Sequence, residues 1–239
     1  MIGEKIIHLP ITSSTNDFLK ENWNIFPHGT VVVADVQTAG RGRFNRPWYS
    51  PEGGLWFSVL FKPRKNVKPN FYTKLCAVSI VRALKHLKID AKLKWPNDIY
   101  ADGKKLAGIL TETIFKEEKL VAVIVGVGMN INNDIPEELN TKATSLKLLT
   151  NVEYKKLSVL SMILRQINKA LKVYSKKPEA LTRVWKNLLM QKEGQLVCVR
   201  TDDETLKGEI IAINEDSITL RTDRGLTSLT SLEIIGFQT

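Results

Sequence analysis

The pattern of apolar residues changes at Met190, and this change constrains the fold more than any other feature of the sequence. Before it, β-branched runs alternate with segments in which apolar residues recur every three or four positions. Such alternation predicts an α+β domain in which a mixed β-sheet is backed by helices. After it, short strand-like segments are separated by polar turns, which is typical of a small β-barrel. We therefore expect two domains, at residues 1–189 and 190–239.

Two segments of the first unit are clear enough to assign individually. Apolar residues spaced by three and four positions over 71–87 predict an amphipathic helix, with Asn70 as its N-cap. The β-rich runs at 106–115 and 120–127 are joined by four charged residues. They predict an antiparallel pair of strands.

Charge is divided unequally between the two units. The 239-residue chain carries a net charge of +10. Residues 190–239 hold five basic and nine acidic side chains, a net charge of −4, so residues 1–189 carry +14. A basic unit favours an anionic partner, and charge alone leaves open a nucleic acid, a nucleotide, a small carboxylate or an acidic protein. A solvated, lysine-rich surface without a partner is the remaining interpretation.

The cysteine, histidine and hydropathy patterns argue against several classes of protein. Cys76 and Cys198 lie far apart and the three histidines are scattered, so no site with Cys or His metal ligands is expected. No apolar run approaches the roughly 20 residues of a membrane helix. The first residues mix acidic and basic side chains, so we expect no signal peptide, no membrane association and a cytoplasmic protein.

One long segment is the most informative for function. Residues 37–54 are rich in glycine, arginine and proline and lack periodicity, and loops of this length are usually functional. The glycines let the backbone approach a ligand, the arginines offer forks for carboxylate or phosphate oxygens, and Trp48 offers a flat apolar face. The loop alone fits an anion-binding site, a basic nucleic-acid segment or a solvated loop. Its central motif is Gly40-Arg41-Gly42-Arg43-Phe44-Asn45-Arg46-Pro47-Trp48.

Three further motifs lie at the ends of predicted strands. The Asn and Asp of motif 94–98 suit a ribose, a phosphate or Mg²⁺, although an ordinary Asn-Asp turn has the same composition. Lys105 precedes a strand in which Gly108 would let a flat ligand lie on the backbone. Motif 126–130 has two glycines but lacks the third glycine and the helix of a dinucleotide fingerprint, so it predicts close backbone contact with a ligand. No motif for a protein nucleophile is present.

Taken together and in this order, these segments resemble the biotin protein ligases. The resemblance rests on Ser14-Thr15-Asn16, Gln37 with Gly40-Arg41-Gly42-Arg43 and Arg46, and motifs 94–98, 105–110, 126–130 and 143–146. It implies a class II synthetase-like mixed sheet followed by an SH3-like β-barrel. It also implies a Mg²⁺-assisted reaction of biotin with ATP to give biotinyl-5′-AMP. The biotinyl group then passes to a lysine of a biotin carrier protein domain.

The resemblance implies roles for individual residues. Arg41 and Lys105 would be catalytic, with Arg41 near the carboxylate and α-phosphate and Lys105 polarising the biotin carboxyl. The biotin site would comprise Ser14, Thr15, Asn16, Gln37, Gly40, Arg41, Gly42, Arg43, Trp48, Lys105, Gly108 and Leu110. The ATP site would comprise Arg43, Arg46, Trp48, Lys94, Asn97 and Asn130, with Asn130 also a Mg²⁺ ligand. The family usually has Gly where this chain has Asn45, the residue next best suited to a left-handed backbone.

Two alternatives and several expectations accompany this interpretation. A lipoate or octanoate ligase usually shows Lys-x-x-Gly-x-Ala, whereas this chain has Lys-x-x-Gly-x-Leu at 105–110. A basic nucleic-acid-binding module would leave the motifs around Asn97, Lys105 and Asn130 unexplained. The first motif begins at Thr12, so we expect a mono-functional ligase that binds no nucleic acid. By resemblance a homodimer is also expected, and biotin or its adenylate should order residues 37–54.

Overall fold

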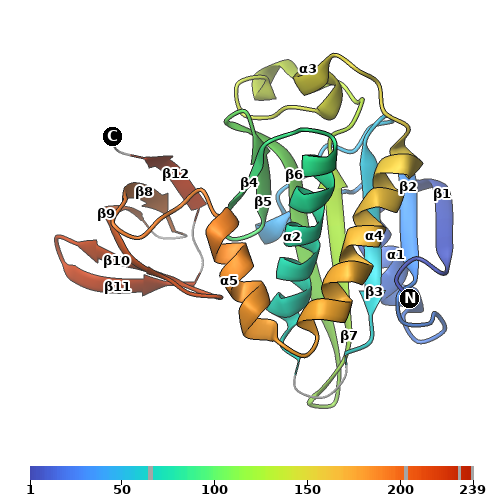
Figure 1. The fold of residues 1–239 in the computed structure, drawn as a ribbon, viewed down its shortest axis with the longest axis horizontal. Coiled ribbons are helices and arrows are strands. Elements are labelled where there is room, and N and C mark those ends of the chain that lie inside the picture. Colours follow the sequence, from blue (N-terminus) through green and yellow to red (C-terminus); the bar gives the residue numbers. More distant parts are fainter. Residues whose placement is uncertain (64–66, 202–203, 231–232, 238–239) are drawn as a thin grey trace.

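A computed structural model describes residues 1–63, 67–201, 204–230 and 233–237. Figure 1 shows a large sheet with α2 and α4 across its near face and a smaller sheet beside α5. The elements of the first part are β1 (Ile6–Thr12), α1 (Thr15–Asn22), β2 (Val31–Gln37), η1 (Arg43–Asn45), β3 (Leu55–Phe61), α2 (Pro69–His86), β4 (Ala91–Lys94), β5 (Asp98–Ala101), β6 (Lys104–Lys116) and β7 (Lys119–Met129). They continue with η2 (Glu137–Leu139), α3 (Leu146–Thr150), α4 (Lys156–Tyr174), α5 (Pro178–Leu188), β8 (Leu196–Arg200), β9 (Thr205–Ile213), β10 (Ile218–Thr222), β11 (Gly225–Leu229) and β12 (Glu233–Phe237).

The larger sheet is mixed and has seven strands in the order β1-β2-β3-β7-β6-β5-β4. β1 and β2 run parallel, and the other neighbours run antiparallel, including the predicted pair that became β6 and β7. All seven residues of β3 are buried because helices cover both faces of the sheet there. The predicted α+β class, with a mixed sheet backed by helices, is confirmed.

The two faces of the sheet have different partners. On one face, the main hydrophobic core includes Val31, Val33 and the buried side of α2, and α4 packs against α2. On the other face, Leu19 of α1 packs with Val32, Leu60 and Ile124 in a smaller core. Because side chains alternate along a strand, even-numbered residues of β7 face α1 and odd-numbered ones face α2. The glycines of motif 126–130 therefore lie on the α1 face.

The second sheet is antiparallel and has five strands in the order β11-β10-β9-β8-β12. α5 ends shortly before its first strand, so the predicted boundary near residue 190 falls in the connection between them. A two-domain division remains a prediction, because several contacts join the two parts. The buried Lys74 of α2 binds Glu215 in the β9–β10 turn, with 2.8 Å between Nζ and Oε1. None of the helices described is long and apolar enough to cross a membrane.

Candidate active site

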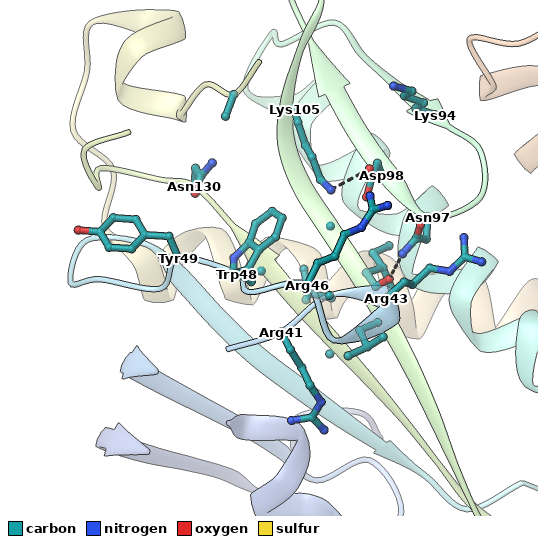
Figure 2. A pocket seen from close by; sticks show the side chains of 18 of the residues that line it. Arg41, Arg43, Arg46, Trp48, Tyr49, Lys94, Asn97, Asp98, Lys105 and Asn130 are labelled. Atoms are coloured by element: carbon teal, nitrogen blue, oxygen red, sulfur yellow. Dashed lines mark hydrogen bonds and ion pairs between the residues drawn. The ribbon is translucent and has the colours of Figure 1, made fainter. Parts of the chain in front are cut away.

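A single cavity of about 350 Å³ collects almost every predicted site residue. It lies at the α1 face of the large sheet, and Figure 2 shows side chains from the 37–54 loop, the 94–98 turn and β6 converging on it. The predicted residues on its wall are Ser14, Thr15, Asn16, Gln37, Arg41, Gly42, Arg43, Arg46, Trp48, Lys94, Asn97, Lys105, Gly108, Leu110 and Asn130. Segments far apart in the sequence thus form one site.

Gly40 is the one predicted residue that does not line this cavity. Its carbonyl accepts a hydrogen bond from Trp48 N at 2.9 Å, which closes the loop on itself. A Cβ at Gly40 would lie 2.5 Å from Ser50 Oγ and 2.8 Å from Trp48 O, too close for any side chain. Glycine is therefore required there to shape the loop.

Three glycines without side chains form the floor of the cavity. Gly108 and Gly128 pair across β6 and β7, and Gly126 lies on the same face two residues along β7. A Cβ at Gly128 would lie 2.4 Å from Trp48 Nε1, and one at Gly108 would lie 3.1 Å from Trp48 Cζ3. The Trp48 indole therefore lies directly on the strand backbone, where the sequence predicted a flat ligand. Its buried Nε1 has no hydrogen-bond partner within the described part of the chain.

A buried polar network surrounds the start of α1. Ser14 caps the helix through its side chain. Thr15 donates its backbone N–H to Gln37 Oε1 at 2.9 Å, and its hydroxyl lies 2.7 Å from Ser58 Oγ. Gln37 Nε2 donates to Ser50 Oγ at 3.0 Å. Three of the predicted biotin-binding residues are thus held together at one end of the cavity.

Arg41 is bound by two carboxylates that the sequence did not suggest. Its Nη1 and Nη2 each lie 2.6 Å from an oxygen of Asp17, and Nη2 lies 3.1 Å from both oxygens of Glu112. Asn16 Nδ2 also donates to Glu112, at 2.7 Å. Hydrogen bonds from Arg41 lower the pKa of Asp17, and those to Asp17 raise the pKa of Arg41. Figure 2 shows Arg41 pointing away from the other labelled basic side chains.

Lys105 and Asp98 form an ion pair on the opposite side of the cavity. Lys105 Nζ lies 2.8 Å from Asp98 Oδ2 and 5.0 Å from the centre of the Trp48 ring. Asn97 Nδ2 donates to Ile109 O, and Ile109 N donates to Asn97 O at 3.0 Å. Asn97 thereby joins the 94–98 turn to β6. The sequence left the role of Asp98 open, and the structure makes it the partner of Lys105.

The centre of the 37–54 loop adopts a left-handed backbone at two residues. Phe44 has φ 57° and Asn45 has φ 53°. Position 45 therefore needs a left-handed backbone, which asparagine adopts more readily than most residues other than glycine. The guanidinium groups of Arg43 and Arg46 lie 4.9 Å and 5.9 Å from the centre of the exposed Phe44 ring. The loop therefore presents both arginines together at the cavity wall.

Asn130 is the candidate metal ligand. Its Nδ2 donates to Thr144 O at 3.0 Å, and its Oδ1 accepts from Asn133 Nδ2 at 3.1 Å. A carbonyl oxygen has two lone pairs, so Oδ1 keeps one for a ligand. No group of three His, Cys, Asp or Glu side chains within the described ranges could hold a metal ion. A bound Mg²⁺ would therefore depend on oxygens of the substrate as well.

Several residues of the site were not suggested by the sequence. Glu112 was detectable, because it lies on β6 two and four residues beyond Leu110 and Gly108 and so shares their face. Ile234 comes from the second sheet, and no local pattern connects it with the cavity. Glu112 reaches the site through Arg41 and does not itself line the cavity, whereas Phe44, Tyr49, Tyr100, Asn133 and Lys142 do.

The charges of the cavity wall indicate which ligands the cavity suits. Among the described residues that line it are six Arg and Lys side chains, namely Arg41, Arg43, Arg46, Lys94, Lys105 and Lys142, and a single carboxylate, Asp98. A glycine floor beside such a wall suits an enzyme that brings two anionic ligands together.

Comparison with known proteins identifies the family. The model of the biotin/lipoate A/B protein ligase family matches residues 8–130. The bifunctional ligase/repressor BirA of Bacillus subtilis is 35% identical over 243 residues, which cover 98% of this chain and 74% of that protein. The structure of Aquifex aeolicus biotin protein ligase in complex with biotin and ATP matches with a TM-score of 0.81 and 32% identity, over 97% of this chain and 98% of that one. The chain belongs to the biotin/lipoate A/B protein ligase family, and its enzyme class is that of the biotin–protein ligases.

Proposed function

We propose that this chain joins biotin to a lysine of a carrier protein in two steps. A biotin carboxylate oxygen attacks the α-phosphorus of ATP, the bond to the β-phosphate oxygen breaks, and pyrophosphate leaves. The lysine amine then attacks the acyl carbon of biotinyl-5′-AMP, an amide forms, AMP leaves and the amine loses a proton. The activity supported by the relatives is biotin activation and transfer.

The single observation that carries the proposal is the basic wall beside the glycine floor. The first step brings a carboxylate to a polyanion, and fixed positive charge in a partly enclosed cavity lowers the repulsion between them. Trp48, Gly108 and Gly128 supply a flat apolar region next to that charge. Positioning and electrostatics suffice for such a reaction, so a protein nucleophile is not needed.

We assign the biotin head to the polar network at α1 and the carboxyl end to Lys105. Ser14, Thr15 and Gln37 offer hydroxyl and amide groups for the ureido ring. Lys105 would polarise the carboxyl, exchanging part of its contact with Asp98 for the substrate. Arg41 already donates through both terminal nitrogens to Asp17 and Glu112, so binding the carboxylate would use its remaining N–H groups or exchange one of these contacts.

We assign ATP to the side formed by Arg43, Arg46, Lys94 and Asn97, with the Trp48 face also available to a ring. Mg²⁺ would be held by Asn130 Oδ1 and by phosphate oxygens, and it would neutralise phosphate charge when bound. The free lone pair on Oδ1 fits this role.

The acceptor we propose is a biotin carrier domain with a negative surface. Residues 1–189 carry +14, which would steer such a domain towards the site and accelerate association at low salt. Association that is insensitive to salt would contradict this steering. By resemblance to the family we also propose a cytoplasmic homodimer.

The test is biotin-dependent exchange of labelled pyrophosphate into ATP. Arg41→Ala and Lys105→Ala should each reduce exchange by about 100-fold or more, the order seen when a charge-stabilising group is removed. Lipoate and octanoate in place of biotin should support little exchange. Preference for either would favour the lipoate ligase alternative, and exchange without any of the three acids would refute the proposal.

A further inference from the structure

The segment that joins the two sheets contacts the proposed nucleotide side of the cavity. Residues 189–191 follow the outer edge of β4, which is an edge strand of the large sheet. Leu189 forms a bridge with Leu93, and Met190 donates its N–H to Leu93 O at 2.7 Å. Gln191 Oε1 then accepts a hydrogen bond from the backbone N–H of Trp95 at 2.9 Å. The segment therefore extends the sheet up to the first residue after β4.

This last hydrogen bond lies at the base of the 94–98 turn. Gln191 is 1% exposed and Trp95 is 3% exposed, so solvent has little access to replace the glutamine as acceptor. The next residue, Pro96, has no backbone N–H. Gln191 thus fixes the turn at its entry, and Asn97 fixes it at its exit through β6.

Burial of Gln191 carries a cost that an apolar side chain would avoid. Its Nε2 is buried without a hydrogen-bond partner in the part of the chain that the structure describes. A buried unsatisfied donor is destabilising, whereas a methionine of similar size would bury no amide. A methionine would, however, leave the buried Trp95 N–H without an acceptor, so the glutamine satisfies one buried group while leaving another unpaired and its net effect on stability is small.

We propose that Gln191 is a positioning residue that holds the 94–98 turn for ATP and thereby couples the second sheet to nucleotide binding. The kinetic part of this proposal rests on the proposed function. Ile234 of β12 lines the same cavity, so the second sheet approaches the site at two points.

The interface between the two parts supplies a matched control. Lys74 and Glu215 also join the large sheet's helices to the second sheet, and neither lines the cavity. Glu215→Gln weakens this attachment without changing any contact of Trp95. Comparison of this variant with the Gln191 variants therefore separates a weaker attachment of the second sheet from a specific loss of positioning of the 94–98 turn.

The experiment compares Gln191→Met, Gln191→Glu and Glu215→Gln in the 239-residue chain. In pyrophosphate exchange, Gln191→Met should raise KM for ATP about fivefold, as expected for one lost hydrogen bond, and leave KM for biotin within about twofold. Gln191→Glu keeps an acceptor oxygen but buries an acidic group, so its KM for ATP should fall between those of the parent and Gln191→Met. Glu215→Gln should lower the melting temperature and leave both KM values unchanged.

A second measurement needs no substrate. In hydrogen–deuterium exchange, a peptide covering residues 93–99 should exchange faster in Gln191→Met than in the parent chain, and at the parent rate in Glu215→Gln. Equal exchange of this peptide in all three proteins would overturn the proposal, as would equal changes of both KM values in Gln191→Met. If the parent protein catalyses no biotin-dependent exchange, the proposed function fails while the deuterium result still decides the positioning role.

Discussion

Gly128→Ala should damage the site more than the fold. The new methyl group would lie 2.4 Å from Trp48 Nε1 and 2.6 Å from Cε2, where ordinary contacts begin at about 3.4 Å. The indole must therefore retreat by about 1 Å, and displacements of that size in a site can reduce rate about 100-fold. Overpacking of a well-packed region costs about 1–3 kcal/mol. Because Trp48 is on a loop that can shift, we expect the lower end, a fall in melting temperature of about 2–4 °C.

The assay is a double-mutant cycle in pyrophosphate exchange and thermal melting. If the clash with the indole is the cause, Gly128→Ala should have almost no further effect in a Trp48→Ala background, because the methyl group then has room. The two changes would be strongly non-additive. An equal loss of activity from Gly128→Ala in both backgrounds would refute the steric argument and would indicate that the glycine acts on ligand directly.

Three further outcomes are expected. Burial pushes the pKa of Glu215 up, but hydrogen bonds from Lys74 and Thr182 hold it at about 2. The ion pair with Lys74 should therefore add about 1–2 kcal/mol to the free energy of unfolding above pH 4.5, after allowance for partial exposure. This contribution should vanish as the pH falls towards 2. Thermal melting of Glu215→Gln and the parent at a series of pH values measures the difference. Asn45→Gly should preserve stability while Asn45→Ala loses about 1 kcal/mol in urea unfolding, because of the left-handed backbone. Asp17→Asn should raise KM for biotin and lower stability by about 1–2 kcal/mol, because Arg41 loses a charged partner; an unchanged KM would show that Arg41 needs no such anchor.

Local patterns were sufficient for the elements with strong periodicity. The helix predicted over 71–87 is α2, and the predicted antiparallel pair is β6 and β7. The N-cap was wrong, since the helix begins at Pro69 after Lys68, because proline suits the first helical position and Asn70 lies inside. The strand β5 was not predicted, because its first residue, Asp98, belongs to the Asn-Asp pair that is typical of a turn.

The sequence by itself predicted most of the residues that line the cavity. Glycines at a given spacing allow the backbone to approach a ligand closely, and the arginines between them supply positive charge for that ligand. Both properties can be read from residue type alone. Tertiary structure alone decided how those residues are paired. Asp17 binds Arg41, and Gln191 reaches Trp95 across 96 positions. Side-chain periodicity states only which face of an element is buried, whereas the choice of partner depends on how separate elements pack in three dimensions.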